Sequence, residues 1–154
     1  IGGGKYKDAR SLAEAVKSLW PVDYYKAHPY VVCTGGEPLL QLDEVLVQAL
    51  HDVGFEVAIE TNGTRPVPLG VDWVCVSPKQ GAELVVSQGD ELKLVYPQSG
   101  LAPAQFESLS FDHFFLQPMD NAEREQNTRG VIDYCLQNPQ WHLSFQMHKL
   151  LGIE

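Results

Sequence analysis

The sequence lacks long hydrophobic runs, an excess of basic residues and an even set of cysteines. No apolar run approaches the roughly 20 residues that cross a bilayer, and no basic stretch before an apolar one indicates a signal peptide. The net charge of −9 argues against general binding to nucleic acids or anionic membranes. The three cysteines, Cys33, Cys75 and Cys135, lie far apart. They favour a reducing cytoplasm and buried thiols over a disulfide framework.

The apolar residues that are present alternate between helical and strand-like periodicity, in the order typical of βαβ units. With 154 residues, the chain has the size of one domain, 1–154. We therefore expect an α/β fold with a mostly parallel sheet covered by helices. Two connections, 61–72 and 77–91, look too short for a full helix, which favours an incomplete or irregular barrel. The expected helices are Asp8–Trp20, Asp43–Val53 and a third from Asn121 to before Pro139; the expected strands are Tyr30–Thr34, Glu56–Glu60, Trp73–Val76, Leu92–Tyr96, His113–Leu116 and His142–Phe145.

Four of the expected strands end in a polar cluster. In parallel α/β folds, ligands bind at the carboxyl ends of the strands, because the following loops gather around one mouth. We therefore expect these clusters to meet at one site. They are TGGEP (Thr34–Pro38), ETNGT (Glu60–Thr64), SPK (Ser77, Pro78 and Lys79) and QPMD (Gln117, Pro118, Met119 and Asp120).

Each cluster also has a purely structural interpretation. Glu37 could begin the following helix, where a carboxylate favours the positive end of the helix dipole. Asn62-Gly63 is a common turn pair, and Lys79 could be solvated in an ordinary loop. Asp120 could be a helix N-cap. His148 and Lys149 are expected to be surface residues.

The clusters carry a resemblance to a known family. TGGEP, ETNGT, SPK, QPMD and the terminal HKLLGI occur in this order over essentially the whole chain. In this the sequence resembles 7-carboxy-7-deazaguanine synthase, of the radical S-adenosylmethionine (SAM) superfamily. GGEP alone indicates only the superfamily, whereas QPMD with HKLLGI is more specific. The resemblance implies an incomplete, TIM-like barrel of mostly parallel strands, of the radical SAM type. It also implies the conversion of 6-carboxy-5,6,7,8-tetrahydropterin to 7-carboxy-7-deazaguanine with loss of ammonia, in queuosine and deazapurine biosynthesis.

The resemblance also implies roles for individual residues. Gly36, Glu37, the segment Ser77-Pro78-Lys79 and the segment Gln117-Pro118-Met119-Asp120 would bind SAM. Backbone carbonyls near Gly36 suit the amine of its methionine part, and the Asp120 carboxylate suits ribose hydroxyls. Thr34 and the last residue, Glu154, would contact the substrate. This chain ends in Glu154 where a member of that family ends in a small apolar residue, so we expect the terminal contact to be kept only if it uses main-chain atoms.

The family's cofactors and partners follow from the same resemblance. It implies SAM, a [4Fe–4S] cluster and Mg²⁺, a reducing donor such as flavodoxin, and a cytoplasmic homodimer. The cluster needs three closely spaced cysteines, CxxxCxxC, and this chain has no such motif. The family places that segment upstream of the GGGK seen at residues 2–5. We therefore expect an N-terminally truncated chain that cannot cleave SAM alone.

Two alternatives remain open from the sequence. A glycyl-radical-activating enzyme shares GGEP and a partial barrel, although QPMD argues against it. A non-catalytic module that binds SAM or a pterin would need no cluster. A product assay with carboxytetrahydropterin separates the synthase from the first alternative, and the sequence before Ile1 separates it from the second.

Overall fold

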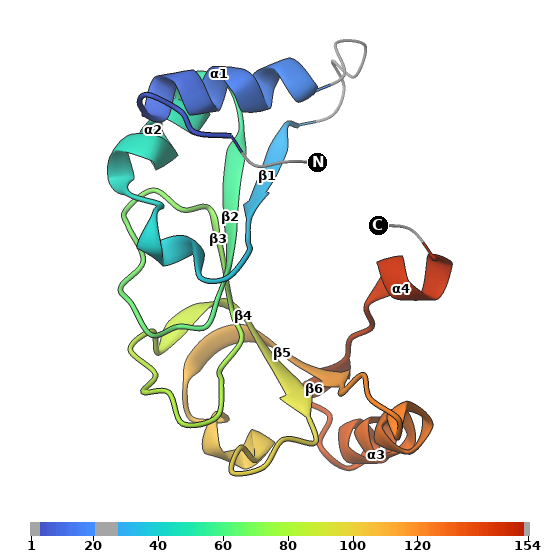
Figure 1. The fold of residues 1–154 in the computed structure, drawn as a ribbon. Helices are drawn as coiled ribbons and strands as arrows, with labels where there is room; N and C mark the ends of the chain where they lie inside the picture. The colour runs from blue at the N-terminus through green and yellow to red at the C-terminus, as the bar shows by residue number, and fades with distance from the viewer. Residues whose placement is uncertain (1–3, 21–27, 153–154) are drawn as a thin grey trace. The chain divides into compact units, whose positions relative to one another are not determined.

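The computed structural model describes residues 4–20 and 28–152, and the chain divides into two compact units. Unit 1 comprises Ile1–Thr61 and Pro66–Val74, and unit 2 comprises Asn62–Arg65 and Cys75–Glu154. Figure 1 shows the ribbon from the blue α1 to the red α4. No helix among the described residues is long and apolar enough to cross a membrane.

Unit 1 places two helices and a short 3₁₀ helix against parallel strands. Strand β1 pairs in parallel with β2, from Tyr30 opposite Glu56 to Cys33 opposite Ile59. Helix α1 begins where the Asp8 carboxylate accepts a hydrogen bond from the Ser11 amide at 2.8 Å, a capping box that satisfies the first-turn donors. The elements of unit 1 are α1 (Ala9–Leu19), β1 (Tyr30–Cys33), η1 (Pro38–Leu40), α2 (Glu44–Asp52), β2 (Glu56–Thr61) and the start of β3 (Trp73–Val76).

The core of unit 1 forms from the apolar faces that the periodicity predicts. Val47 and Leu50 on α2 and Val57 and Ile59 on β2 are almost fully buried. Phe55, between them, packs edge-on against Trp20 with ring centroids 5.7 Å apart. Burying such side chains stabilises a fold by about 1.5–3 kcal/mol each, so this cluster holds α2 against the strands.

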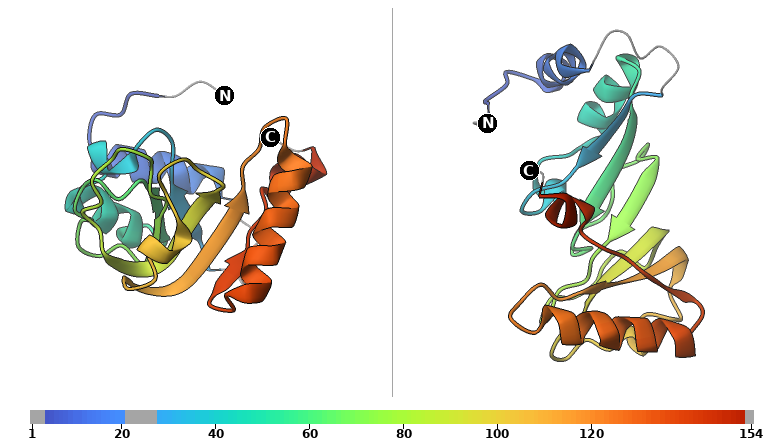
Figure 2. Two further views of the ribbon diagram at one scale, coloured as in Figure 1. Left: turned by 90° about the horizontal axis from the view of Figure 1, so that it is seen from below. Right: turned by 90° about the vertical axis from the view of Figure 1, so that its right-hand side faces the viewer.

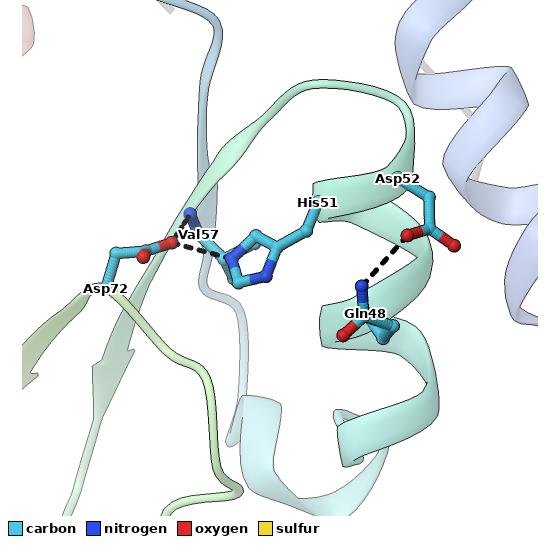
Figure 3. A network of polar contacts seen from close by, with 5 residues as sticks. All are labelled: Gln48, His51, Asp52, Val57 and Asp72. Carbon is cyan, nitrogen blue, oxygen red and sulfur yellow. Dashed lines mark hydrogen bonds and ion pairs between the residues drawn. The ribbon is translucent and has the colours of Figure 1, made fainter.

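A polar network ties the loop before β3 to β2 and α2 (Figure 3). The Asp72 Oδ2 atom accepts a hydrogen bond from the Val57 amide at 2.7 Å and lies 2.8 Å from Nε2 of His51. The Asp72 amide in turn donates to the Val57 carbonyl at 2.8 Å. The hydrogen bond from Val57 and, to a smaller extent, the contact with His51 lower the pKa of Asp72. The carboxylate is therefore held in its ionised form.

Unit 2 contains the longer strands, and its pairs are again parallel. Strand β4 pairs with β5 from Gln88 opposite Ser110 to Tyr96 opposite Pro118. Strand β6 pairs with residues 114–116 of β5. Helix α3 packs on β5 and β6 (Figure 2), and its Val131 side chain is fully buried. Unit 2 comprises the end of β3, β4 (Gln88–Tyr96), η2 (Pro103–Gln105), β5 (Ser110–Pro118), α3 (Arg124–Gln137), β6 (Trp141–Leu143) and α4 (Met147–Leu151).

The expected α/β class with parallel strands is confirmed, and so is the place of every expected strand. Several boundaries differ. Strand β4 begins at Gln88 rather than Leu92, and β5 begins at Ser110 rather than His113, since hydrogen bonding between these two strands extends both toward their N-terminal ends. The third expected helix, α3, begins at Arg124 rather than near Asn121. The short helix α4, Met147–Leu151, was not expected.

Candidate functional site

The loop after β1 carries Thr34, Gly35 and Gly36, all of which are exposed. Gly35 has φ = +124°, a conformation that other residues rarely adopt. A Cβ atom built on Gly35 or Gly36 would meet nothing within 4 Å. The backbone conformation at residue 35, and not crowding, therefore favours glycine there. The backbone of Gly35 and Gly36 borders open space that a ligand can enter.

Glu37 fastens this loop to the end of β2. Its Oε1 atom accepts hydrogen bonds from the Leu39 amide at 3.0 Å and from the Thr61 hydroxyl at 2.7 Å. Glu37 is the N-cap of the 3₁₀ helix η1, while α2 is capped by Asp43. The interpretation of Glu37 as the start of the next α-helix is therefore wrong. In unit 1 the structure brings together TGGEP and Thr61 of ETNGT, as the strand-end argument predicts.

The last three residues of ETNGT, 62–64, form a tight turn in unit 2. The Asn62 Oδ1 atom accepts from the Thr64 amide at 2.9 Å and from its hydroxyl at 2.7 Å. Gly63 has φ = +75°, and a Cβ atom there would lie 2.6 Å from Cδ1 of Leu84 and 2.7 Å from Cγ1 of Val76. The turn interpretation of Asn62-Gly63 is therefore confirmed, and a side chain at residue 63 would require Leu84 and Val76 to move.

The SPK segment follows β3 in unit 2. Pro78 is buried, whereas Lys79 is exposed and its Nζ donates a hydrogen bond to Oγ of Ser77 at 2.8 Å. The segment therefore presents a cation and a hydroxyl together, held by their own contact.

The QPMD segment is fixed by its backbone. Gln117 and Pro118 end β5, and the Met119 amide donates to the Tyr96 carbonyl of β4 at 2.8 Å. Asn127 of α3 is 5% exposed, and its Nδ2 donates to the Met119 carbonyl at 2.9 Å and to Oδ1 of Asn121 at 2.9 Å. The loop that presents Asp120 is thus held on both sides of Met119.

Asp120 is not the N-cap of α3, because that position belongs to Glu123. Its Oδ2 atom instead accepts a hydrogen bond from Nζ of Lys149 on α4. This hydrogen bond and the positive charge of Lys149 lower the pKa of Asp120. Lys149 is exposed, as expected, but the sequence did not indicate its partner.

A cavity of about 490 Å³ opens at this segment of unit 2. Its volume is within the range of about 300–1,000 Å³ typical of small-molecule sites. Asp120 and Lys149 both line it, so their ion pair is part of the wall. The other lining residues come from β5, α3 and the segment before α4: Gln117, Pro118, Arg124, Glu125, Thr128, Arg129, Phe145 and Gln146.

Three expectations concern the substrate contact of Glu154, the three cysteines and a metal site. Glu154 lies outside the described residues. Cys33 is in β1, Cys75 in β3 and Cys135 in α3, and burial raises the pKa of Cys33 and Cys135, which disfavours their thiolates. Within residues 4–20 and 28–152, no group of three or more His, Cys, Asp or Glu side chains could hold a metal ion.

Comparison with known proteins gives consistent results over nearly the whole chain. It is 57% identical over 152 residues to the 7-carboxy-7-deazaguanine synthase of Bordetella pertussis, covering 99% of this chain and 71% of that protein. The synthases of Bradyrhizobium diazoefficiens and Burkholderia multivorans are 56% and 54% identical over 151 residues, covering 98% of this chain and 71% of each.

A solved structure agrees with these relatives. The crystal structure of QueE from Escherichia coli matches with a TM-score of 0.64 and 28% identity. The match covers 90% of this chain and 63% of that one. No protein-family profile matches the chain.

Proposed function

Because the chain belongs to the 7-carboxy-7-deazaguanine synthase family, we propose that it is the SAM- and substrate-binding part of a radical SAM lyase. The complete enzyme converts 6-carboxy-5,6,7,8-tetrahydropterin to 7-carboxy-7-deazaguanine with loss of ammonia, a step of queuosine and deazapurine biosynthesis. The observation that carries the proposal is the 57% identity over 99% of the chain. It favours the synthase over a glycyl-radical-activating enzyme and over a non-catalytic binding module.

Two features of the described residues fit SAM. The open space beside Gly35 and Gly36 lets backbone carbonyls approach a bound amine, and the Asp120 carboxylate borders a cavity of suitable volume. In the proposed site Gly36 and Glu37 bind the methionine end, Glu37 also by holding its loop to Thr61. Asp120 accepts hydrogen bonds from the ribose hydroxyls. The remaining SAM contacts are assigned to Ser77, Pro78, Lys79, Gln117, Pro118 and Met119.

The substrate contacts are assigned to Thr34 and Glu154. Thr34 is exposed at the end of β1 and can donate and accept hydrogen bonds through its hydroxyl. When SAM is bound and reduced by a cluster, it supplies a 5′-deoxyadenosyl radical for hydrogen abstraction. The residues of this chain bind and orient the two molecules and exclude water.

The described residues contain no cysteine motif for a [4Fe–4S] cluster and no group of three or more His, Cys, Asp or Glu side chains that could hold a metal ion. The three cysteines lack the CxxxCxxC spacing, and partial burial raises the pKa of Cys33 and Cys135. We assign the cluster and Mg²⁺ ligands to the part of the complete enzyme that this chain does not contain. The same proposal includes a single radical SAM core domain over 1–154, a cytoplasmic homodimer, and a reducing donor such as flavodoxin.

The SAM assignment is tested with Asp120→Ala in the complete enzyme. Losing a carboxylate that accepts ribose hydrogen bonds weakens SAM binding roughly tenfold or more, because hydrogen bonds to charged groups contribute about 1.5–3 kcal/mol. Calorimetry measures the affinity. Asp112→Ala is the matched control, since Asp112 is an exposed carboxylate on β5, the strand that precedes Asp120.

Either of two results contradicts the proposal. Unchanged SAM affinity in Asp120→Ala contradicts the assignment of the QPMD loop to SAM binding. Failure of the wild-type complete enzyme to form 7-carboxy-7-deazaguanine from carboxytetrahydropterin, under reducing conditions with SAM, removes the activity itself.

A further inference from the structure

The contact between Asp120 and Lys149 joins two segments that are 29 residues apart in the sequence. Asp120 follows β5, and Lys149 lies on α4 in the same unit. Both side chains are partly exposed, Lys149 by 44% and Asp120 by 36%. An ion pair with this exposure contributes little to folding stability, because water screens it. Its effect is expected instead where a ligand covers it.

The cavity gives this pair a different environment once it is filled. A neutral sugar lying against Asp120 would remove water from the carboxylate without supplying a positive charge. An ionised carboxylate that loses its hydration needs a compensating cation. In unit 2 the hydrogen bond from Lys149 already provides that cation, and it uses only one of the several acceptor positions that a carboxylate offers.

The other cations that line the cavity are placed differently. Arg129 is ion-paired to Glu125 one turn earlier on α3. Arg124 influences Asp120 through its charge, more weakly than Lys149 does. Among the described residues that line the cavity, Lys149 is thus the cation in hydrogen-bond contact with the carboxylate.

We infer that Lys149 is a positioning residue for the proposed SAM site: its ammonium group fixes and neutralises the Asp120 carboxylate so that this group accepts the ribose hydroxyls. The inference rests on the proposed function, which assigns Asp120 to SAM. It adds a residue on α4 that acts through Asp120 and does not itself touch the ligand.

The test is a double-mutant cycle in the complete enzyme with its cluster reconstituted. The SAM dissociation constant is measured by calorimetry for wild type, Lys149→Met, Asp120→Asn and the double variant. Methionine keeps the length of the side chain and removes its charge. Lys149→Met is expected to weaken SAM binding about three- to tenfold, within the range of coupling between contacting charged groups.

Coupling between the two residues distinguishes positioning from direct contact. If Lys149 acts through Asp120, the Lys149→Met change has less than about a twofold effect in the Asp120→Asn background, because the carboxylate charge that it neutralises is gone. Lys149→Arg, which retains a cation, is expected to bind SAM more tightly than Lys149→Met. Lys17→Met, on the exposed surface of α1, is the control for removing one positive charge.

The thermal midpoint of each variant is the second measurement. A partly exposed pair predicts a Lys149→Met midpoint close to that of wild type. A large drop in this midpoint would mean that the pair is structural and would overturn the inference. The inference is also overturned if Lys149→Met binds SAM as tightly as wild type, or if the effects of the Lys149 and Asp120 substitutions on SAM affinity are fully additive.

The remaining result separates this inference from the function itself. If Asp120→Asn binds SAM as wild type does, both the cofactor assignment and the role of Lys149 are wrong. If Asp120→Asn binds weakly and Lys149→Met binds normally, the inference alone is wrong.

Discussion

Replacing Asn127 by alanine is expected to loosen the loop that carries QPMD. The Asn127 side chain is 5% exposed and donates two hydrogen bonds of 2.9 Å each, to the Met119 carbonyl and to Oδ1 of Asn121. Each hydrogen bond contributes about 0.5–1.5 kcal/mol, so losing both costs about 1–3 kcal/mol. The higher helix propensity of alanine recovers about 0.5 kcal/mol of this.

Urea unfolding of the complete enzyme measures this loss, and calorimetry measures the accompanying loss of SAM affinity. Gln126→Ala, at the exposed neighbouring position of α3, is the control and is expected to stay within about 0.5 kcal/mol of wild type. Surface substitutions usually change the free energy of unfolding by no more than about 0.5 kcal/mol. If Asn127→Ala stays within about 0.5 kcal/mol of the control, the reasoning is refuted.

The Asn127→Asp variant adds a test of the sign. Its carboxylate would face two acceptors, the Met119 carbonyl and Oδ1 of Asn121, in a buried place. Burial without a donor raises the pKa of the introduced group above its unfolded value. The folded state then binds the proton more tightly, so the destabilisation relative to wild type decreases as pH falls through the raised pKa. A pH-independent difference contradicts this account.

Two further changes test the scaffold. Asp72→Ala removes the acceptor for the Val57 amide, and since the Asp72 side chain is 41% exposed the expected loss is only about 1 kcal/mol in urea unfolding. Because the pKa of Asp72 is lowered, this loss is present above pH 3.8 and disappears as pH falls through the folded-state pKa, so a constant difference contradicts it. Gly63→Ala is expected to lower stability by about 1–3 kcal/mol. Gly81→Ala, with similar φ but no atom within 4 Å of the added Cβ, should cost less in thermal melts, and equal midpoints contradict the crowding argument.

The fold could be predicted where one face of a segment is apolar. Val47 and Leu50 mark the buried face of α2, and Val57 and Ile59 mark that of β2. Prediction failed where hydrogen bonds to a neighbour, rather than apolar side chains, determine the structure. The first residues of β4, such as Gln88 and Gly89, have no apolar pattern and are strand only because they pair with β5.

The candidate site shows the same division. The motifs indicated Asp120 and Glu37, because each lies at the end of an apolar run. Their partners are set by tertiary contacts: Thr61 is 24 residues from Glu37, and Lys149 is 29 residues from Asp120. Asn127 also escaped notice, since an amide within a helical pattern has no local signal. The motif HKLLGI includes Lys149 and is the one sequence signal that indicates this residue.

The parallel registers also bear on how the chain folds. Residue 56 pairs with residue 30, residue 110 with residue 88, and residue 141 with residue 114, which gives separations of 26, 22 and 27 residues. Loop-closure entropy grows only slowly with length, so these closures cost nearly the same. In each unit a strand finds its partner one step earlier in the chain. Assembly of these strand pairs can therefore follow synthesis strand by strand.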